Sequence, residues 1–268
     1  MTVTLQHILE VAQQRVGALR ERRAELEVAA RGAPGAPAWS TAFGADEVAV
    51  IAEIKRRSPS AGIIAGDVDP ASHAAAYAAG GARAISVLTE GPHFGGSLED
   101  LELVRRVVPL PLLRKDFILD PVQLYEARVA GASAVLLIVR ALDSAQLAEL
   151  AAAAGELGLG RLVEVHATEE LERALAVEPE SVGVNSRDLE TFEVDVRRVR
   201  DIIRQVPQNT VAVAESGLRD RSDVERAAEW GADAVLIGTA FSGAGDPQSA
   251  VRSLAGVARR GRRGGRGS

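Results

Sequence analysis

The chain has 268 residues, of which 47% are hydrophobic and 25% are charged. This balance is typical of one globular domain, and barrels of alternating strands and helices commonly have this length. The absence of cysteine excludes disulfide bonds, thiolate metal sites and a cysteine nucleophile. The net charge is −6, but the last seventeen residues hold six of the 31 basic residues and no acid, which leaves 25 basic against 37 acidic residues in 1–251. An acidic body of this kind argues against a nucleic-acid-binding surface.

The N-terminal region predicts neither export nor a membrane span. Polar residues, among them Gln6, Glu10 and Gln13, interrupt its apolar positions, so no continuous hydrophobic stretch forms. We therefore expect a cytoplasmic protein without membrane association. The histidines are His7, His73, His93 and His166. Their spacing does not match that of metal ligands, and we expect neither a metal nor an organic cofactor.

Residues 4–31 predict an amphipathic helix ahead of the main fold. Leu5, Ile8 and other apolar residues recur on one helical face, Thr4 is a candidate N-cap, and Gly32 follows the last turn. Glycine and proline then break the structure over residues 32–38. Two aromatic residues after this break are expected to pack against the first strand: Trp39 and Phe43.

From residue 48 onward, short apolar runs rich in β-branched residues alternate with longer helical patterns. The expected strands are 48–54, 84–88, 110–114, 134–139, 161–165, 181–185, 210–214 and 234–238. Eight strands, each followed by a helix, predict a closed parallel (β/α)₈ TIM barrel with an N-terminal extension helix. A doubly wound open sheet would usually have fewer strands and a single glycine-rich dinucleotide turn.

Two recurring motifs support the barrel. The pattern G-A-x-A precedes a strand at Gly81, Gly131 and Gly231. Three Asp-Pro pairs are expected to begin helices, because aspartate caps free amides and proline suits the first helical position. These pairs start at Asp69, Asp120 and Asp246. Both motifs are structural, and we attach no function to them.

The C-terminal segment GVARRGRRGGRGS is rich in glycine and arginine and lacks apolar spacing beyond Val257. Such a segment buries too little surface to become ordered. RNA binding by this short basic run is the alternative interpretation. We thus divide the chain into a helical extension (1–46), a catalytic barrel (47–258) and a disordered tail (259–268).

Polar residues gather where the expected strands end, which is where barrel enzymes build their active sites. Glu53 and Lys55 are two residues apart on a strand and therefore point to the same side. Glu164 lies between two valines, and Lys115 follows the apolar run PLPLL, so both charges would need partners to offset desolvation. The alternatives are a structural ion pair at a solvated rim for Glu53 and Lys55, and a surface lysine for Lys115.

The last two strands are followed by small and hydroxyl-bearing residues. Barrel enzymes often hold a phosphate at this place with backbone amides and the start of a short helix. The residues concerned are Ser216, Gly217, Gly238 and Thr239. Any one of these could be a plain turn residue, but together they predict a phosphorylated small-molecule substrate.

The motifs IAEIKRRSPSAG, AISVLTEGPHFGGSLEDL, LLRKDFILDP, LVEVHATEEL, VGVNSRDLETFEVD, VAESGL and VLIGTAF occur in this order between residues 48 and 241. Together they resemble the indole-3-glycerol phosphate synthase family, and the leader helix resembles that family's N-terminal extension. The resemblance implies a carboxy-lyase of tryptophan biosynthesis. Its substrate would be 1-(2-carboxyphenylamino)-1-deoxyribulose 5-phosphate, and its products indole-3-glycerol phosphate, carbon dioxide and water.

The resemblance also implies roles for individual residues. Lys115 would be the general acid of ring closure, and Glu164 and Glu53 would be the acid and base of dehydration, with Lys55 as a rival acid. The remaining implied catalytic residues, which would orient sugar hydroxyls or the lysines, are Asn185 and Glu215. The residues implied for substrate binding are Ser58, Pro59, Phe94, Phe117, Arg187, Ser216, Gly217, Gly238 and Thr239, helped at the phosphate by Lys55.

Two positions depart from the family pattern. His93 stands where phenylalanine is common, and Ser186 stands where asparagine is common. Neither change removes an implied catalytic group. Only the lining of the pocket for the carboxyphenylamino (anthranilate) part of the substrate is affected. The rival interpretations are another phosphate-binding barrel, such as a sugar-phosphate isomerase or a Schiff-base aldolase that uses Lys115, and a barrel that binds a metabolite without catalysis. We expect a monomer, without excluding an oligomer.

Overall fold

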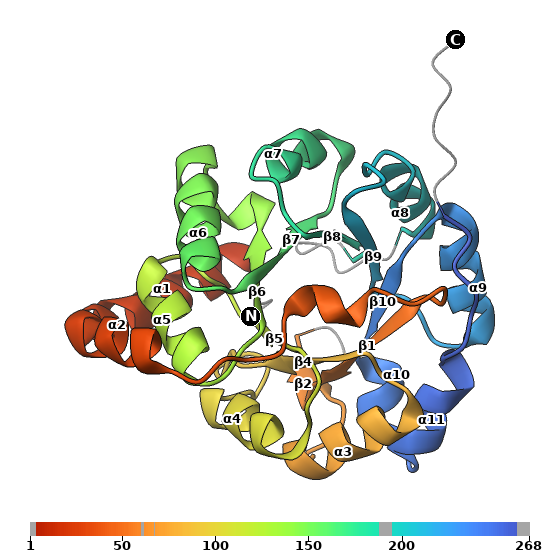
Figure 1. Ribbon diagram of the computed structural model, residues 1–268, viewed down its shortest axis with the longest axis horizontal. Coiled ribbons are helices and arrows are strands. Elements are labelled where there is room, and N and C mark those ends of the chain that lie inside the picture. Colours follow the sequence, from red (N-terminus) through yellow and green to blue (C-terminus); the bar gives the residue numbers. More distant parts are fainter. Residues whose placement is uncertain (1–3, 60–61, 67, 188–194, 262–268) are drawn as a thin grey trace.

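A computed structural model of the protein describes residues 4–59, 62–66, 68–187 and 195–261. Eight parallel strands close into a barrel in the order β1-β10-β9-β8-β7-β6-β5-β4 (Figure 1). The barrel strands are β1 (Ala49–Ile54), β4 (Ala84–Leu88), β5 (Leu112–Lys115), β6 (Ala134–Ile138), β7 (Gly160–Val165), β8 (Ser181–Asn185), β9 (Val211–Glu215) and β10 (Ala234–Ile237). Each predicted strand overlaps one of these, so the predicted (β/α)₈ TIM barrel is confirmed.

Helices surround the barrel and connect its strands (Figure 1). The outer helices are α3 (Pro70–Gly80), α4 (Leu98–Val107), α5 (Pro121–Val129), α6 (Ser144–Glu156), α7 (Leu171–Leu175), α8 (Val196–Ile203), α9 (Arg221–Trp230) and α11 (Pro247–Leu254). Shorter helical elements are η1 (Trp39–Ala42), η2 (Val139–Ala141), η3 (Thr168–Glu170) and α10 (Thr239–Ser242). One feature was not predicted: between β1 and α3, β2 (Arg57–Ser58) and β3 (Gly62–Ile63) pair as an antiparallel hairpin.

The two structural motifs have the conformations expected of them. At the three Asp-Pro pairs the aspartate is the N-cap and its side chain accepts a hydrogen bond from a backbone N–H in the first turn. These pairs therefore begin α3, α5 and α11. Gly81 and Gly231, which follow α3 and α9, have φ values of 103° and 96°. This left-handed conformation strains other residues, which explains why glycine recurs there.

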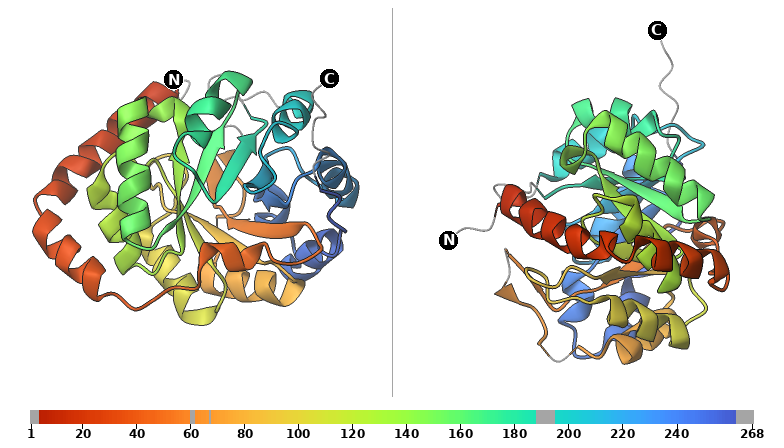
Figure 2. Two further views of the ribbon diagram at one scale, coloured as in Figure 1. Left: turned by 45° about the horizontal axis from the view of Figure 1, so that its top comes forward. Right: turned by 90° about the vertical axis from the view of Figure 1, so that its left-hand side faces the viewer.

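The N-terminal extension differs from the single helix predicted over residues 4–31. It consists of two helices, α1 (Leu5–Arg20) and α2 (Arg23–Gly32), and the Thr4 side chain caps α1 as expected. The break lets the extension bend along the outside of the barrel (Figure 2). Val16 of α1 and Leu26 of α2 can then pack on the same residue, Val122 of α5.

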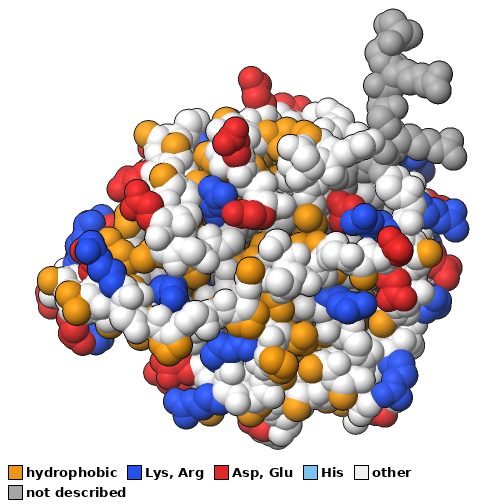
Figure 3. Space-filling model, in the orientation of Figure 1, with side chains coloured by type: hydrophobic (Ala, Val, Ile, Leu, Met, Phe, Trp, Pro, Cys, Tyr) orange, Lys and Arg blue, Asp and Glu red, His pale blue; other side chains and the backbone are white. Residues whose placement is uncertain are grey.

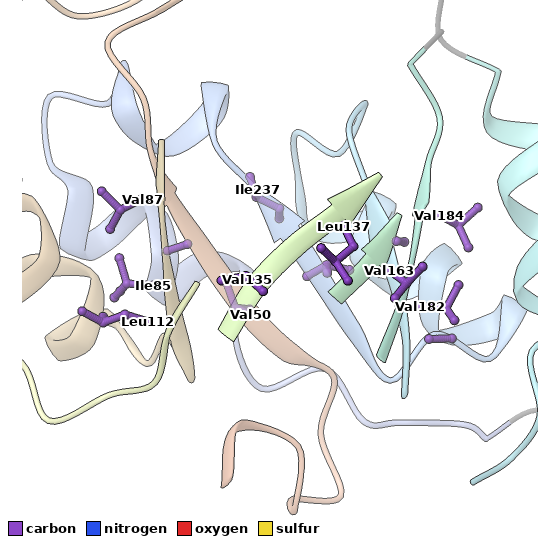
Figure 4. Packing of buried hydrophobic residues seen from close by; sticks show 14 of the residues in the cluster. Val50, Ile85, Val87, Leu112, Val135, Leu137, Val163, Val182, Val184 and Ile237 are labelled. Carbon is purple, nitrogen blue, oxygen red and sulfur yellow. The ribbon is translucent and has the colours of Figure 1, made fainter. Parts of the chain in front are cut away.

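Alternation along each strand separates two apolar cores. Residues such as Val50, Val135 and Val163 point outward, toward the helices (Figure 4). Their neighbours in sequence, among them Ile51 and Leu162, fill the barrel interior. Because the side-chain period of a strand is two, the residues that follow on the inward side reach the carboxyl end of the barrel. Glu53 lies two residues beyond Ile51 and therefore belongs to the inward set.

Trp39 and Phe43 close the opposite end of the barrel. The two rings form an edge-to-face pair with centroids 5.1 Å apart, and the chain around residue 40, orange-red in Figure 1, crosses the middle of the barrel. The Trp39 indole N–H donates to Ser181 Oγ at 3.0 Å. A Cβ on Gly160 would lie 2.5 Å from Trp39 Cβ, so glycine makes room for the ring. Only the carboxyl end of the strands is thus left open for a site.

Acidic and basic side chains are interspersed on the face shown in Figure 3. Among the described helices, none is both long and apolar enough to cross a membrane. Most of the predicted disordered tail, residues 262–268, lies outside the described residues. Its first residues contact the rest of the protein: the Arg259 N–H donates to the Asp46 carbonyl at 2.8 Å, and Arg260 pairs with Glu229 of α9 at 3.5 Å.

Candidate active site

A cavity of about 610 Å³ opens at the carboxyl end of the barrel. Every residue that the sequence assigned to the site lines this one cavity, and they come from the ends of β1, β5, β7, β8, β9 and β10 and from the segments that follow these strands or β4. These residues are Glu53, Lys55, Ser58, Pro59, Phe94, Lys115, Phe117, Glu164, Asn185, Arg187, Glu215, Ser216, Gly217, Gly238 and Thr239. The structure thus brings the whole predicted set together, while the role of each member remains a proposal.

Lys115 lies at the centre of a buried charge cluster. Its Nζ is 2.7 Å from Glu215 Oε2 and 3.3 Å from Glu164 Oε2. Both carboxylate side chains are nearly inaccessible to solvent, with 1% and 2% of their area exposed. The cluster arises because Lys115, Glu164 and Glu215 are inward-facing residues at or near the ends of β5, β7 and β9. Lys115 is therefore not the surface lysine of the alternative interpretation.

The charges of this cluster are set by its composition. Burial disfavours the ammonium of Lys115, but attraction to Glu215 and Glu164 outweighs burial and raises the lysine pKa above its usual range. Burial also opposes ionisation of Glu164, yet Lys115 and His166 lower its pKa. Burial raises the pKa of Glu215 to about 8, with Lys115 opposing and Glu164 adding to this shift. Of the two carboxyl groups beside Lys115, Glu215 is therefore the one that holds a proton more readily.

A second charged pair lies at the end of β1 and just beyond it. Lys55 Nζ is 2.9 Å from Glu53 Oε1, and the Glu53 side chain is 3% exposed. Glu53 is therefore buried and Lys55 is 16% exposed, which differs from the solvated rim pair of the alternative interpretation. A Cβ on Gly238 would lie 2.2 Å from Glu53 Oε1 and 3.1 Å from Lys55 Nζ. The missing side chain of Gly238 therefore leaves room for both charged groups. Ser242 Oγ accepts from the Lys55 N–H and donates to the Glu53 carbonyl, each at 3.1 Å, which fixes this stretch of backbone.

One end of the cavity has the features of an anion site. Ser216 and Gly217 follow β9 with φ values of 63° and 72°, and a left-handed serine is a strained residue of the kind that clusters at functional sites. Gly238 precedes Thr239, the first residue of the short helix α10. The first N–H groups of a helix have no partner within it and can bind an anion.

The other end has apolar walls. The rings of Phe94 and Phe117 lie 6.4 Å apart with a 38° angle between their planes. The loop that carries Phe94 is held by Glu90, whose Oε2 accepts from the N–H groups of His93 and Phe94 at 2.7 and 2.9 Å. The Asn185 side-chain oxygen accepts from the Arg187 N–H at 3.0 Å. These contacts hold the Phe94 loop and the Arg187 backbone in place.

Sequence reasoning missed several residues at this site. His166 is fully buried behind Glu164, with its Nε2 3.3 Å from Glu164 Oε1, and Arg219 lines the cavity. Outside the cavity, the buried Arg114 was also missed: it lies on the outward side of β5, where Asp116 and Glu126 bind it at 3.0 and 2.7 Å. The alternation of strand β5, which turns Lys115 inward, could have predicted that Arg114 faces the helices.

One signal in the sequence could have identified the site directly. The chain has only two lysines among its 31 basic residues, and both line this cavity. Arginine does not release its proton in proteins, whereas lysine can. Within the part of the chain that the structure describes, no group of three histidine, aspartate or glutamate residues has the arrangement of a metal site.

Comparison with solved structures supports the fold. The chain is similar to 3-hexulose-6-phosphate synthase from Salmonella typhimurium, with a TM-score of 0.60 and 15% identity over 77% of this chain and 96% of that one. It is also similar to thiamine phosphate pyrophosphorylase from Pyrococcus furiosus, with a TM-score of 0.58 and 18% identity over 77% and 93% of the two chains. At such identities the likeness shows the barrel alone.

Comparison of sequences is more specific. The family model for indole-3-glycerol phosphate synthase matches residues 5–254. Indole-3-glycerol phosphate synthase from Rhodococcus jostii is 49% identical over 231 residues, which cover 86% of each chain. The enzyme of the same name from Mycobacterium ulcerans is 48% identical over 86% of this chain and 85% of its own. The chain therefore belongs to the indole-3-glycerol phosphate synthase family and is a carboxy-lyase of tryptophan biosynthesis.

Proposed function

We propose that the cavity binds 1-(2-carboxyphenylamino)-1-deoxyribulose 5-phosphate in one orientation. The observation that carries this proposal is that Lys115 of β5 reaches across the barrel to Glu215 of β9. The residues of the anion site follow β9 and β10, whereas Phe94 and Phe117 follow β4 and β5 on the other side of the barrel. The phosphate would bind to the end formed by Ser216, Gly217, Gly238 and Thr239, helped by Lys55. The carboxyphenyl ring would lie at the end walled by Phe94 and Phe117, which Ser58, Pro59 and Arg187 border.

Lys115 is the general acid of ring closure. As the aromatic carbon that bears the carboxylate attacks the ribulose carbonyl, the carbonyl oxygen takes a proton from the ammonium and becomes a hydroxyl. The carboxylate then leaves as carbon dioxide, and its bonding electrons return to the ring. The charge pattern supports this assignment, because attraction to the Glu164 carboxylate favours the protonated form of Lys115. A Schiff-base aldolase would instead need a neutral amine.

Dehydration completes the indole ring and requires two further groups. Glu164 protonates the departing hydroxyl, and Glu53 removes a proton from the adjacent carbon, with Lys55 as the rival acid. Glu164 is a carboxylate at rest, so it must gain its proton after Lys115 has given up its own. Asn185 and Glu215 orient the sugar hydroxyls or the lysines, and the 2.7 Å contact between Glu215 and Lys115 favours the lysine as the partner of Glu215.

Turnover of the proposed substrate tests this function. Purified protein incubated with the carboxyphenylamino-deoxyribulose phosphate should release carbon dioxide and form indole-3-glycerol phosphate in equal amounts. The indole product is followed by its fluorescence. As a control, borohydride treatment in the presence of a ketose phosphate should leave the protein mass unchanged. Absence of indole fluorescence, or a mass increase from a trapped Schiff base at Lys115, would contradict the proposal.

We also propose that the enzyme acts as a monomer in the cytoplasm. Every residue assigned to the site comes from one chain, so the cavity is lined without a second copy. Light scattering of the eluting protein should give the mass of one 28.1 kDa chain. A stable dimer mass at micromolar concentration would overturn the monomer assignment without affecting the site.

A further inference from the structure

In the proposed reaction a single oxygen atom receives two protons in succession. The first proton turns the ribulose carbonyl into a hydroxyl, and the second lets that hydroxyl leave as water. Lys115 can supply only one proton before it must be reloaded. The second proton must therefore come from a group that can reach Lys115 or Glu164 in this buried site. The source of that proton deepens the proposed function and rests on it.

Glu215 is the group with the best access to Lys115. The contact between Glu215 Oε2 and Lys115 Nζ is 2.7 Å, against 3.3 Å for Glu164. Two carboxyl groups share a single ammonium here, and two buried carboxylates beside one positive charge favour protonation of one of them. Among the described residues, the other oxygen of Glu215, Oε1, has no hydrogen-bond partner.

We propose that Glu215 stores the second proton of the reaction and passes it to Lys115 after Lys115 has protonated the carbonyl oxygen. Lys115 then relays this proton to Glu164, its neighbour at 3.3 Å, and Glu164 donates it to the departing hydroxyl. Glu215 thus acts through Lys115 and does not need to touch the substrate.

The protons balance over one turnover. Two are given to the oxygen, which leaves as water, and one is taken from the carbon by Glu53. The substrate carboxylate leaves as neutral carbon dioxide, so the reaction consumes one proton from solvent. That proton restores Glu215, while the proton held by Glu53 replaces the one that Lys115 first gave.

Gly183 is the positioning residue that makes this arrangement fit. It faces Glu164 in the register of β7 and β8, and its φ lies outside the left-handed region that favours glycine. The space is what requires glycine: a Cβ at this position would lie 2.0 Å from Glu215 Oε1 and 3.1 Å from the carboxyl carbon. A side chain there would displace the Glu215 carboxyl group from its place beside Lys115.

The test separates the two stages in single turnovers of Glu215→Gln. Glutamine has nearly the shape of the protonated carboxyl and carries no charge, so carbon dioxide release should stay within about threefold of the wild-type rate. Indole formation should slow on the order of tenfold or more, because Lys115 can then be reloaded only from solvent. Slowing of both stages by the same factor would show that Glu215 merely holds Lys115 in place and would overturn the proposal.

The pH dependence gives a readout that a structural role would not produce. In the wild type, the rate of indole formation should fall above about pH 8, because Glu215 has lost its proton there. Glu215→Gln should lack this decline, since glutamine does not titrate. An identical decline in both proteins would contradict proton storage. Failure of the wild type to form any indole would instead refute the proposed function itself.

Gly183→Ala tests the geometry while leaving Glu215 unchanged. It should slow indole formation more than carbon dioxide release. Gly155→Ala is the matched control, because a Cβ on this exposed residue of α6 would meet nothing within 4 Å, and both rates should equal those of the wild type. Circular dichroism establishes that the variants are folded. A folded Gly183→Ala protein with the wild-type rate of indole formation would count against the proposal.

Discussion

The two lysines of this chain show how residue choice follows chemistry. All other basic residues are arginines, and arginine suffices for ion pairs such as the one between Arg114 and Asp116. A step that transfers a proton needs a cation that can lose it. Lys115 meets this need and is held by partners that keep it charged until the substrate takes its proton.

Replacement of Lys115 should separate chemistry from binding. In Lys115→Met, ring closure should slow by about 10²–10⁴, as is typical for loss of a general acid, while the substrate still binds through its phosphate. Single-turnover rates and a calorimetric titration measure the two effects. Lys55→Met is the comparison and should chiefly weaken binding. A large loss of affinity in Lys115→Met with a normal ring-closure rate would mean that the roles of the lysines are reversed.

At the same scale, sequence patterns located the site but not its detailed contacts. The two-residue spacing of Glu53 and Lys55 correctly predicted that both face the cavity, Glu53 from β1 and Lys55 from just beyond it, because strand alternation is local. The contact of Lys115 with Glu215 joins residues 100 positions apart, and it depends on the register of neighbouring strands. The space left by Gly183 could not be predicted for the same reason.

At the scale of elements, local signals predicted where helices and strands begin. Aspartate caps and strand alternation act within a few residues, so they survive in the folded structure. The leader is different, because its helical pattern continues through Glu21 and Arg22 while the structure bends there. The bend serves contacts with α5, as at Val122, and such tertiary contacts leave no periodic signal. The hairpin β2–β3 is too short to show alternation.

The element η1, which closes the end of the barrel opposite the cavity, should contribute stability without affecting catalysis. Trp39→Ala should lower the free energy of unfolding by about 3–5 kcal/mol, the usual cost of truncating a buried tryptophan. Trp39→Phe should cost only about 1 kcal/mol, because a smaller aromatic ring still fills most of the space while the hydrogen bond to Ser181 is lost. Urea denaturation measures both. Equal losses in the two variants would show that the hydrogen bond, not the ring, is what matters.

At the scale of the whole molecule, the chain separates stability from function along the barrel axis. Trp39 and Phe43 close one end, whereas the polar strand endings gather at the other. Small aliphatic residues fill the layers between, which suits a chain with only 3% aromatic residues. Composition alone therefore agreed with a barrel, but the order of the motifs was needed to identify the family.

Two truncations test how far the tail matters to the molecule. Removal of residues 262–268 should leave the melting temperature and turnover unchanged, because this glycine- and arginine-rich segment has no apolar face to bury. Removal from residue 259 onward also deletes the backbone bond to Asp46, the ion pair of Arg259 with the nearly buried Asp233 and the exposed pair of Arg260 with Glu229, and should cost about 1 kcal/mol. Differential scanning calorimetry compares them. A large drop in melting temperature for the shorter deletion would mean that the tail is structural.

The central claim is that one cavity carries out two chemical stages with different groups. Rapid-quench single turnovers of Glu164→Gln test it most directly, because glutamine fills the same space but cannot donate the proton that dehydration needs. We predict that carbon dioxide release proceeds while indole formation lags, so that a decarboxylated but still hydrated intermediate accumulates. If carbon dioxide release and indole formation slow equally and no intermediate appears, Glu164 is not the acid of dehydration and Lys55 takes that role.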